Sequence, residues 1–273
     1  MLRKQELVAK GLMWLSKEPL DLTVIYYTSN YLEEQNPVFV SNTKKQLLKA
    51  IGNHPLISIS QKSMDFGTNL CVGDIGRKHR NIYWQILQGC KMAKTKYVAM
   101  AEDDILYSYE HFHTYVPKKR IFAFDKQKLS LFTWTKPPMY SFRTRRFVIN
   151  QMICHRDLMI EAMEERFARV PELLKEGKTS EWIDSRWGDP GRYERLLGVK
   201  AQEREEYYSH TPSIVFSHPK AFGYETNQGK KKRIGDVKMY DIPYWGQAKD
   251  VLLYYYKDRE AKDPQEIAEY EKV

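Results

Sequence analysis

The chain has 273 residues, of which 42% are hydrophobic and 13% aromatic; this composition excludes an intrinsically disordered protein and allows a sizeable buried core. The formal charge of +9 is gathered in short basic runs, which favours phosphate-bearing partners such as nucleotides, nucleic acid or anionic lipid headgroups. No apolar run approaches the roughly 20 residues that cross a bilayer, and three widely spaced cysteines exclude a cysteine-rich zinc site, so we expect a cytoplasmic protein with reduced thiols.

The first hundred residues alternate between strand and helix patterns. Residues 22–27, 56–60 and 97–101 are rich in β-branched, aromatic or other apolar residues and predict strands. Apolar residues at helical spacing predict helices over 42–51 and 81–92. Because parallel strands need crossover connections, this alternation predicts an α/β fold with a mostly parallel sheet flanked by helices.

The second half of the chain is less regular. Strands are predicted over 129–134, 146–154 and 213–216, a helix over 157–167, and a polar loop over 177–191.

The predicted organisation is a single catalytic domain over residues 21–258, because no internal repeat or low-complexity linker divides the chain. Residues 1–20 are expected to carry an amphipathic N-terminal helix at 7–15, and residues 259–273 to form a charged tail.

Three consecutive carboxylates, Glu102, Asp103 and Asp104, directly follow the predicted strand at 97–101. Three anions at the end of a buried strand repel one another and resist desolvation, so they need compensation. A divalent cation bound by clustered oxygen ligands is the usual compensator. The alternative is an acidic turn left in water, and the apolar residues on both sides of the motif argue against it.

Two further features suggest ligand binding. Arg77, Lys78 and Arg80 precede a predicted helix start, where free backbone amides and the helix dipole favour phosphate; the alternative is a solvated basic turn. His218 follows the predicted strand at 213–216 and offers an imidazole, which suits Mn²⁺ better than Mg²⁺; the alternative is a structural histidine.

Taken together, these segments resemble the nucleotide-sugar-dependent glycosyltransferases of the GT-A fold, especially their family-2-like inverting branch. The resemblance spans roughly residues 20–220 and implies a GT-A-like, Rossmann-like domain. It implies that the polar loop after the first strand, with Thr28 and Asn30, begins the nucleotide pocket. It further implies that the 76–81 loop, with Arg77 and Arg80, contacts the donor.

The acidic run resembles the DXD metal motif of this family, with Glu102 in the first acidic place, where the family usually has Asp. The resemblance implies that Asp104 and His218 ligate Mn²⁺ or Mg²⁺, and that Glu102 and Asp103 contact the donor. Lys231 lies where these enzymes commonly have a loop that closes on the donor, so we expect it to reach the diphosphate.

An inverting transferase needs a base, normally a carboxylate, to deprotonate the acceptor hydroxyl. The resemblance implies that this base lies in the 179–194 region. We expect Asp184 or Glu181, then Glu194, and Asp189 is also eligible.

The leading hypothesis is a metal-dependent hexosyl- or pentosyltransferase that uses a nucleotide-sugar, with UDP as the expected nucleotide. The basic runs at 143–146 and 230–233 favour DNA with a hydroxymethylated pyrimidine as the acceptor, as in phage DNA modification, which would take place in the host cytoplasm. A cell-surface or lipid-linked glycan is the alternative acceptor. A sugar-nucleotide nucleotidyltransferase and a non-catalytic DNA-binding protein are the alternatives from other classes.

Overall fold

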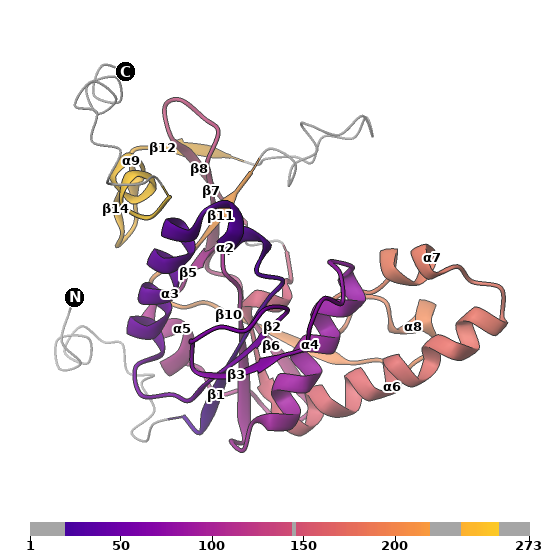
Figure 1. The fold of residues 1–273 in the computed structure, drawn as a ribbon. Helices are drawn as coiled ribbons and strands as arrows, with labels where there is room; N and C mark the ends of the chain where they lie inside the picture. Colours follow the sequence, from indigo (N-terminus) through magenta and orange to yellow (C-terminus); the bar gives the residue numbers. More distant parts are fainter. Residues whose placement is uncertain (1–19, 144–145, 219–235, 257–273) are drawn as a thin grey trace.

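The computed structural model describes residues 20–143, 146–218 and 236–256 (Figure 1). The expected N-terminal helix at 7–15, the charged tail at 259–273 and the basic run at 230–233 with Lys231 lie outside the described residues.

The larger sheet has the order β10-β6-β9-β4-β1-β2-β3 in the described residues. β1, β2, β3 and β4 run parallel, β6 and β10 are parallel to each other, and β9 is antiparallel to both β4 and β6. The α/β class with a mostly parallel sheet is therefore confirmed. The strands are β1 (Leu22–Thr28), β2 (Leu56–Ser60), β3 (Thr68–Cys71), β4 (Tyr97–Ala101), β6 (Ile121–Asp125), β9 (Met152–His155) and β10 (Glu203–Tyr207).

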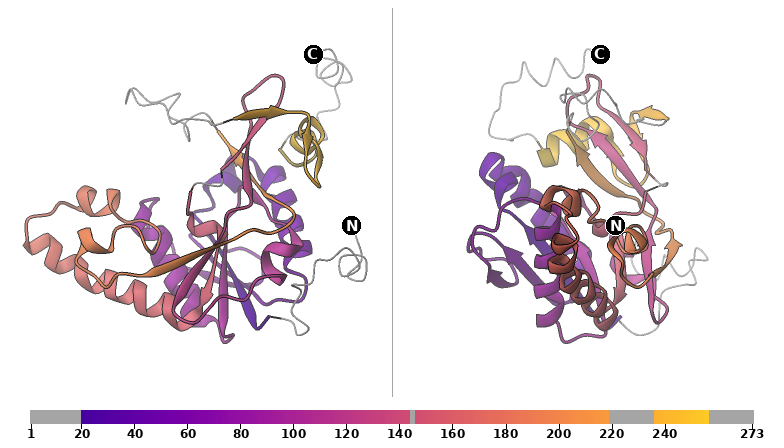
Figure 2. Two further views of the ribbon diagram at one scale, coloured as in Figure 1. Left: turned by 180° about the vertical axis from the view of Figure 1, so that it is seen from behind. Right: turned by 90° about the vertical axis from the view of Figure 1, so that its right-hand side faces the viewer.

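The inner strand β1 is buried on both faces. Its alternate residues Ile25 and Tyr27 join the core formed with α4 (His79–Met92) and α6 (Arg156–Lys175). Val24 and Tyr26 join the opposite core, which includes residues of α3 (Pro37–Ile51). Helices thus cover both faces of the sheet, which explains why β1 is apolar almost throughout. α6 runs beside α4 and extends beyond the sheet, with α7 (Ser180–Ser185) and α8 (Glu194–Leu197) at its far end (Figures 1 and 2).

A smaller sheet with the order β12-β8-β7-β11-β5 lies at one end of the larger one (Figure 1). One face of this sheet carries Leu129, Leu131, Ile214 and Phe216, which form a third apolar core. Its strands are β5 (Ile105–Leu106), β7 (Lys128–Phe132), β8 (Met139–Phe142), β11 (Ser213–Ser217) and β12 (Val237–Met239). The remaining described elements are β13 (Asp241–Ile242), β14 (Gly246–Gln247), α2 (Tyr31–Gln35), α5 (Tyr109–His113), α9 (Ala248–Val251), η1 (Ile149–Gln151) and η3 (Leu252–Tyr256).

Several predicted boundaries were wrong for local reasons. α3 begins at Pro37 rather than at residue 42, because the Asn36 side chain caps it by accepting from Phe39 N and proline suits the first helical position. The predicted strand at 146–154 is η1 followed by β9. The polar loop predicted at 177–191 contains α7, whose start is capped by the Thr179 side chain.

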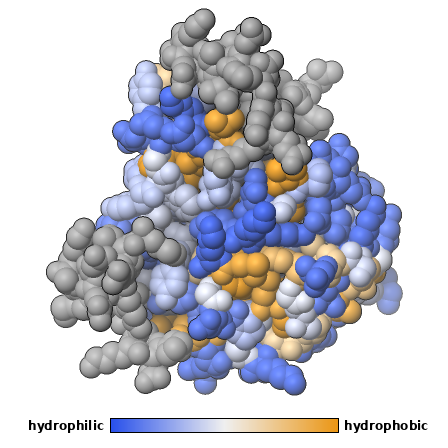
Figure 3. Space-filling model, turned by 60° about the vertical axis from the view of Figure 1, so that its left-hand side comes forward, coloured by the Kyte–Doolittle hydropathy of each residue, from blue (hydrophilic) through white to orange (hydrophobic). Residues whose placement is uncertain are grey.

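The face shown in Figure 3 is largely hydrophilic and carries an apolar patch, and the mean hydropathy of the chain is −0.63. Among the described residues, no helix has both the length and the apolar character needed to cross a bilayer.

Candidate functional site

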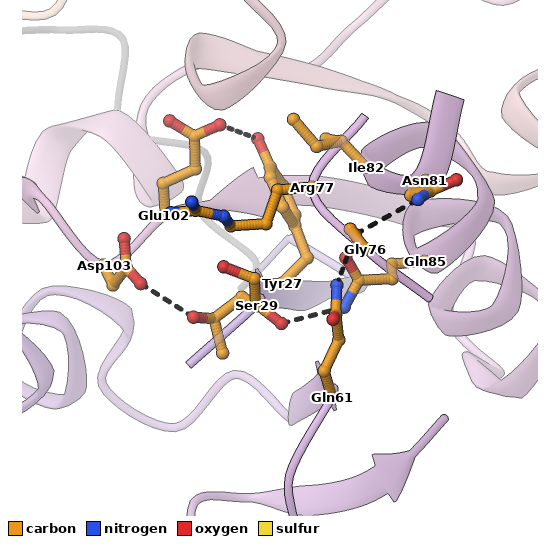
Figure 4. A pocket seen from close by; sticks show the side chains of 11 residues that line it. Tyr27, Ser29, Gln61, Gly76, Arg77, Asn81, Ile82, Gln85, Glu102 and Asp103 are labelled. Atoms are coloured by element: carbon orange, nitrogen blue, oxygen red, sulfur yellow. Dashed lines mark hydrogen bonds between the residues drawn. The ribbon is translucent and has the colours of Figure 1, made fainter. Parts of the chain in front are cut away.

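A pocket of about 150 Å³ opens at the carboxyl ends of β1 and β4. The chain passes from β1 to β2 and β3 on one side of β1 and then crosses through α4 to β4 on its other side, and ligands bind α/β sheets at such reversals of strand order. The lining residues come from the ends of β1, β2 and β4, from the loop before α4 and from α4 itself (Figure 4): Tyr27, Thr28, Ser29, Gln61, Gly76, Arg77, Asn81, Ile82, Gln85, Glu102 and Asp103.

The loop after β1 is held by its own polar side chains. Asn30 has a left-handed backbone, with φ 61°, and its N–H donates to Thr28 Oγ1 at 2.9 Å. The Asn30 side-chain oxygen accepts from the backbone N–H groups of Gln61 and Lys62. Asn30 therefore ties the β1 and β2 ends together, while Thr28 lines the pocket. Gln85 of α4 closes the floor by donating to the carbonyls of Thr28 and Ile59.

Glu102 and Asp103 are fixed by hydroxyl donors from β1. Tyr27 donates to Glu102 Oε1 at 2.6 Å, and Thr28 donates to Asp103 Oδ2 at 2.7 Å (Figure 4). The second Glu102 oxygen accepts from Asn150 Nδ2 at 2.5 Å. Both Glu102 oxygens are thus occupied, and the carboxylate has a defined orientation.

Burial raises the pKa of each carboxyl group in the acidic motif. For Glu102 the hydrogen bonds from Tyr27 and Asn150 offset part of this increase, and for Asp103 the Thr28 hydroxyl does so. The pKa of Asp104 is raised well above its usual value, by burial first and then by the charges of Glu102 and Asp103. Its Oδ1 atom is buried and has no hydrogen-bond partner in the described part of the chain.

The basic residues around the start of α4 have different roles. Arg77 lines the pocket, with its guanidinium 3.8 Å from the centre of the Tyr31 ring. Arg80 instead pairs with Asp184, with 2.5 Å between Nε and Oδ1, and donates to Ser180 at 2.6 Å. The first turn of α4 is thereby connected to α7, and Arg77 is the arginine that faces the pocket.

The carboxylates expected to include a base lie in different environments. Glu181 is exposed in the first turn of α7, where a backbone hydrogen bond and the Thr179 side chain lower its pKa. Asp184 is held by Arg80. Glu194 is buried, pairs with Arg166 of α6 and accepts from Gly191 N at 2.6 Å.

Asp189 stands apart from these three carboxylates. It is 8% exposed and accepts a 3.2 Å hydrogen bond from Tyr83 of α4. Burial raises its pKa, and its charge contributes to the raised pKa of Glu102. Asp189 is therefore electrostatically coupled to the pocket.

The two expected metal ligands come from neighbouring segments. The Asp104 carbonyl accepts from Phe216 N at 2.9 Å, so the end of β11, which leads to His218, lies beside the acidic motif. His218 itself is exposed. In the described residues, no group of three or more His, Cys, Asp or Glu side chains is arranged to hold a metal ion, and the metal role of Asp104 and His218 stays a prediction.

Three residues that organise the site were missed in the sequence: Tyr27, Tyr107 and Asn150. The Tyr107 hydroxyl accepts from Glu102 N at 3.2 Å and donates to the Asn150 carbonyl at 2.9 Å. Tyr27 stands at the end of a predicted strand beside the expected pocket, which was a usable signal. Nothing in the local pattern distinguishes Asn150, which reaches Glu102 from 48 residues away along the chain.

Comparison with known proteins does not define a family. No family model matches the chain, and no curated protein matches it. The apo-form glycosyltransferase GlyE of Streptococcus pneumoniae TIGR4 is similar with a TM-score of 0.39 and 8% identity, over 68% of this chain and 45% of that one. A glycosyltransferase involved in the glycosylation of the major capsid of PBCV-1 has a TM-score of 0.38 and 13% identity, over 70% of this chain and 82% of that one. This chain thus spans less than half of the length of GlyE, and the function is argued from the site residues.

Proposed function

We propose that this protein is a glycosyltransferase that moves a sugar from a nucleotide-sugar, with a UDP-sugar as the expected donor, to a hydroxyl acceptor. The observation that carries the proposal is the pocket at the ends of β1 and β4, which combines the basic start of α4 with Glu102 and Asp103. A nucleoside diphosphate needs both kinds of group. Cations and helix amides bind its phosphates, and fixed carboxylates bind hydroxyls or a cation.

Within this pocket, Arg77 and the first turn of α4 are proposed to hold the diphosphate. Arg77 supplies a guanidinium whose planar donors suit phosphate oxygens, and its stacking on Tyr31 limits its motion. Glu102, oriented by Tyr27 and Asn150, is proposed to accept hydrogen bonds from donor hydroxyls. Arg80 supports the loop through its ion pair with Asp184.

We place the proposed divalent cation at the end of β4. Burial disfavours the charge of all three carboxylates, and the buried Asp104 Oδ1 lacks a partner in the described residues. We propose that Asp104 and His218 hold Mn²⁺ or Mg²⁺, with Asp103 as the alternative carboxylate. When bound, such an ion stabilises the negative charge that develops on a departing nucleoside diphosphate.

For the base, we place Asp189 ahead of Asp184, Glu181 and Glu194. A base is most effective when its pKa lies near the working pH, and burial moves the pKa of Asp189 in that direction. The Glu194 and Asp184 carboxylates are already bound by arginines.

The acceptor is proposed more broadly. In the basic run at 118–120, Lys118 pairs with Glu205 and Arg120 with Glu161, so these two cations are neutralised within the protein. Because these two cations are neutralised, the run at 118–120 does not favour DNA over a glycan. We therefore propose both DNA carrying a hydroxylated base and a glycan as acceptors.

The test is an acceptor and donor screen with the full-length protein, Mn²⁺ and a panel of nucleotide-sugars. The acceptors are hydroxymethylated DNA, unmodified DNA and soluble glycans, and both the released nucleotide and the product mass are measured. Release of the nucleoside diphosphate together with a sugar-bearing product supports the proposal. Formation of pyrophosphate indicates a nucleotidyltransferase, and DNA binding without turnover of any donor indicates a binding protein.

A further inference from the structure

The face of the smaller sheet opposite its apolar core carries polar residues that the donor pocket does not use. Lys128 of β7 points away from Leu129 and Leu131, which face the apolar core, because successive side chains of a strand alternate. Lys128 is only 2% exposed. Its ammonium donates to the Arg146 carbonyl at 2.6 Å, and no carboxylate of the described residues lies within ion-pair distance of it.

The neighbouring Lys126 shows what a compensated buried lysine looks like in this protein. Lys126 is 1% exposed, and its ammonium lies 3.2 Å from Glu206 and 3.7 Å from the centre of the Phe147 ring. In the described residues, the Lys128 ammonium has a neutral carbonyl as its hydrogen-bond partner, and the charges of Asp125 and Asp189 act on it only from beyond ion-pair distance. Burial, followed by the charge of Lys126, lowers the pKa of Lys128 to about 8. Burying a charge without a partner is unfavourable, so Lys128 is a position where an anion is missing.

The strand register places Lys128 in a row of polar side chains. Leu129 pairs with Phe142, so the next position places Arg143 opposite Lys128, and Arg143 N donates to the Lys128 carbonyl. On the other side, Ser213 of β11 is the register partner of Lys128. Directly opposed side chains lie on the same face, and like charges in such positions repel each other. Arg143, Lys128 and Ser213 thus form a transverse row that is basic at its Arg143 end.

Ser213 is a second, independent indication of a ligand. It is fully buried, and its Oγ has no hydrogen-bond partner in the described residues. A buried hydroxyl without a partner costs about 1–3 kcal/mol. The row opens toward solvent at the end away from Ser213, where Arg143 is half-buried and Arg146 is exposed.

The same row ends beside Tyr107, whose hydroxyl supports the donor pocket. Ile214 and Val215 pair with Leu106 and Ile105, so the next position places Tyr107 beside Ser213. Adjacent strands lie about 4.8 Å apart, and Lys128 is therefore roughly 10 Å from Tyr107 across the sheet. The Tyr107 hydroxyl contacts Glu102 N and the Asn150 carbonyl.

We propose that Lys128, Ser213 and Arg143 form a second binding subsite that takes the phosphate group of a small phosphorylated acceptor, next to the donor pocket. As an acceptor subsite it depends on the proposed glycosyltransferase function. The ammonium, hydroxyl and guanidinium supply donors from three adjacent strands, which suits a tetrahedral oxyanion. The deep burial of Lys128 excludes the backbone of duplex DNA from direct contact with its ammonium.

The experiment is calorimetric titration of the full-length protein with inorganic phosphate and with a hexose phosphate. Lys128→Met is expected to weaken binding of both at least tenfold, and Ser213→Ala severalfold. Lys91→Met, which removes a surface lysine paired with Glu164, is expected to leave phosphate affinity within twofold of wild type. Lys128→Met should fold, because it removes a buried charge without a carboxylate partner, and Ser213→Ala provides the test if it does not.

Unchanged phosphate affinity in both the Lys128 and Ser213 variants would overturn the subsite. Oligonucleotide binding that depends on Lys128 would overturn the small-acceptor assignment. A UDP titration separates this inference from the proposed function. UDP binding together with a phosphate affinity that does not depend on Lys128 would overturn only the subsite. Phosphate binding that depends on Lys128, without UDP binding, would overturn only the donor assignment.

Discussion

The two sides of Glu102 differ in how fully their buried polar groups are satisfied. On the donor side, the side chains of Glu102, Asp103 and Asn30 have hydrogen-bond partners within the protein. On the segments toward β11 and η1, several buried side-chain atoms have no partner in the described residues: Asp104 Oδ1, Asn150 Oδ1, both amide atoms of Gln151, and Ser213 Oγ. Buried polar groups are normally paired, so the first side is preorganised, and we propose that a bound ligand or ion completes the second. Substitutions on the two sides test this contrast, starting with the largest expected effect.

Asp104→Asn is expected to reduce sugar transfer about 1,000-fold, equivalent to about 4 kcal/mol of transition-state stabilisation. The melting temperature should be unchanged or higher, because burial disfavours the carboxylate charge and asparagine has nearly the same shape. Initial rates and thermal unfolding measure the two effects, and Asp65→Asn, at an exposed position, is the matched control. Transfer within tenfold of wild type would contradict the metal assignment.

Glu194→Gln is expected to destabilise the protein by about 3 kcal/mol, because it leaves the buried Arg166 without its charge partner. Denaturant unfolding measures this loss. Transfer by the fraction that remains folded should be close to normal. A variant that is as stable as wild type but inactive would identify Glu194 as the base and displace Asp189 from that role.

Asp189→Asn is expected to lower turnover about 100-fold while leaving UDP affinity unchanged, as loss of a general base does. The pH profile of the wild-type rate should fall as Asp189 is protonated, above the usual aspartate range because burial raises its pKa. Asp184→Asn and Glu181→Gln are the comparison variants. Normal turnover in Asp189→Asn with loss in either of those would move the base to α7.

The stability of the ligand-free protein is expected to rise with pH between about 8 and 10.5 through Lys128. The folded-state pKa lies below the unfolded value, so the unfolded chain binds the extra proton in this interval, and folding is favoured as the proton is lost. The slope from one such group is at most about 1.4 kcal/mol per pH unit. The charges of Lys126 and Arg146 lower the pKa of Lys128 further, and those of Asp125 and Asp189 raise it. The free energy of unfolding is measured with denaturant for wild type and for Lys128→Met, and the difference between the two isolates the contribution of Lys128. A difference that does not vary with pH would show that the charge of Lys128 is compensated in the folded protein.

Tyr27→Phe is expected to have the smallest effect, about 1 kcal/mol of stability and a severalfold lower rate, since it removes one hydrogen bond to Glu102 while Asn150 retains the other. The comparison is Tyr31→Phe, whose ring continues to stack on Arg77. A loss above 100-fold would mean that the Tyr27 hydroxyl contacts the substrate.

The strands β1, β2 and β4 of the large sheet could be predicted because their sequence signals are local. β1, β2 and β4 are apolar segments whose periodicity and bounding turns are visible in the sequence, and the acidic motif follows β4 directly. β3 and β10 escaped prediction because TNLC and EREEY are polar edge strands, formed by pairing with β2 and β6 rather than by their own composition. The position of the pocket followed from the strand ends, which depend on the same local signals.

The residues that hold the site side chains in place could not be predicted from local signals. Asn150 reaches Glu102, and Ser213 lies beside Lys128, only through the register of strands far apart in the chain. Arg80 and Asp184 were both singled out for substrate contacts, but charge alone could not indicate that they pair with each other.

The central claim is that the pocket at the ends of β1 and β4 binds a nucleoside diphosphate. Its most direct test is calorimetric titration of the full-length protein with UDP in the presence and absence of Mn²⁺. Arg77→Ala is the pocket variant, and Arg169→Ala, whose arginine pairs with Glu172 and Glu176 on α6 and its C-terminal cap, is the control. We expect Mn²⁺-enhanced binding that weakens at least tenfold in Arg77→Ala and stays unchanged in Arg169→Ala. No UDP binding, or equal affinity in wild type and Arg77→Ala, would contradict the account.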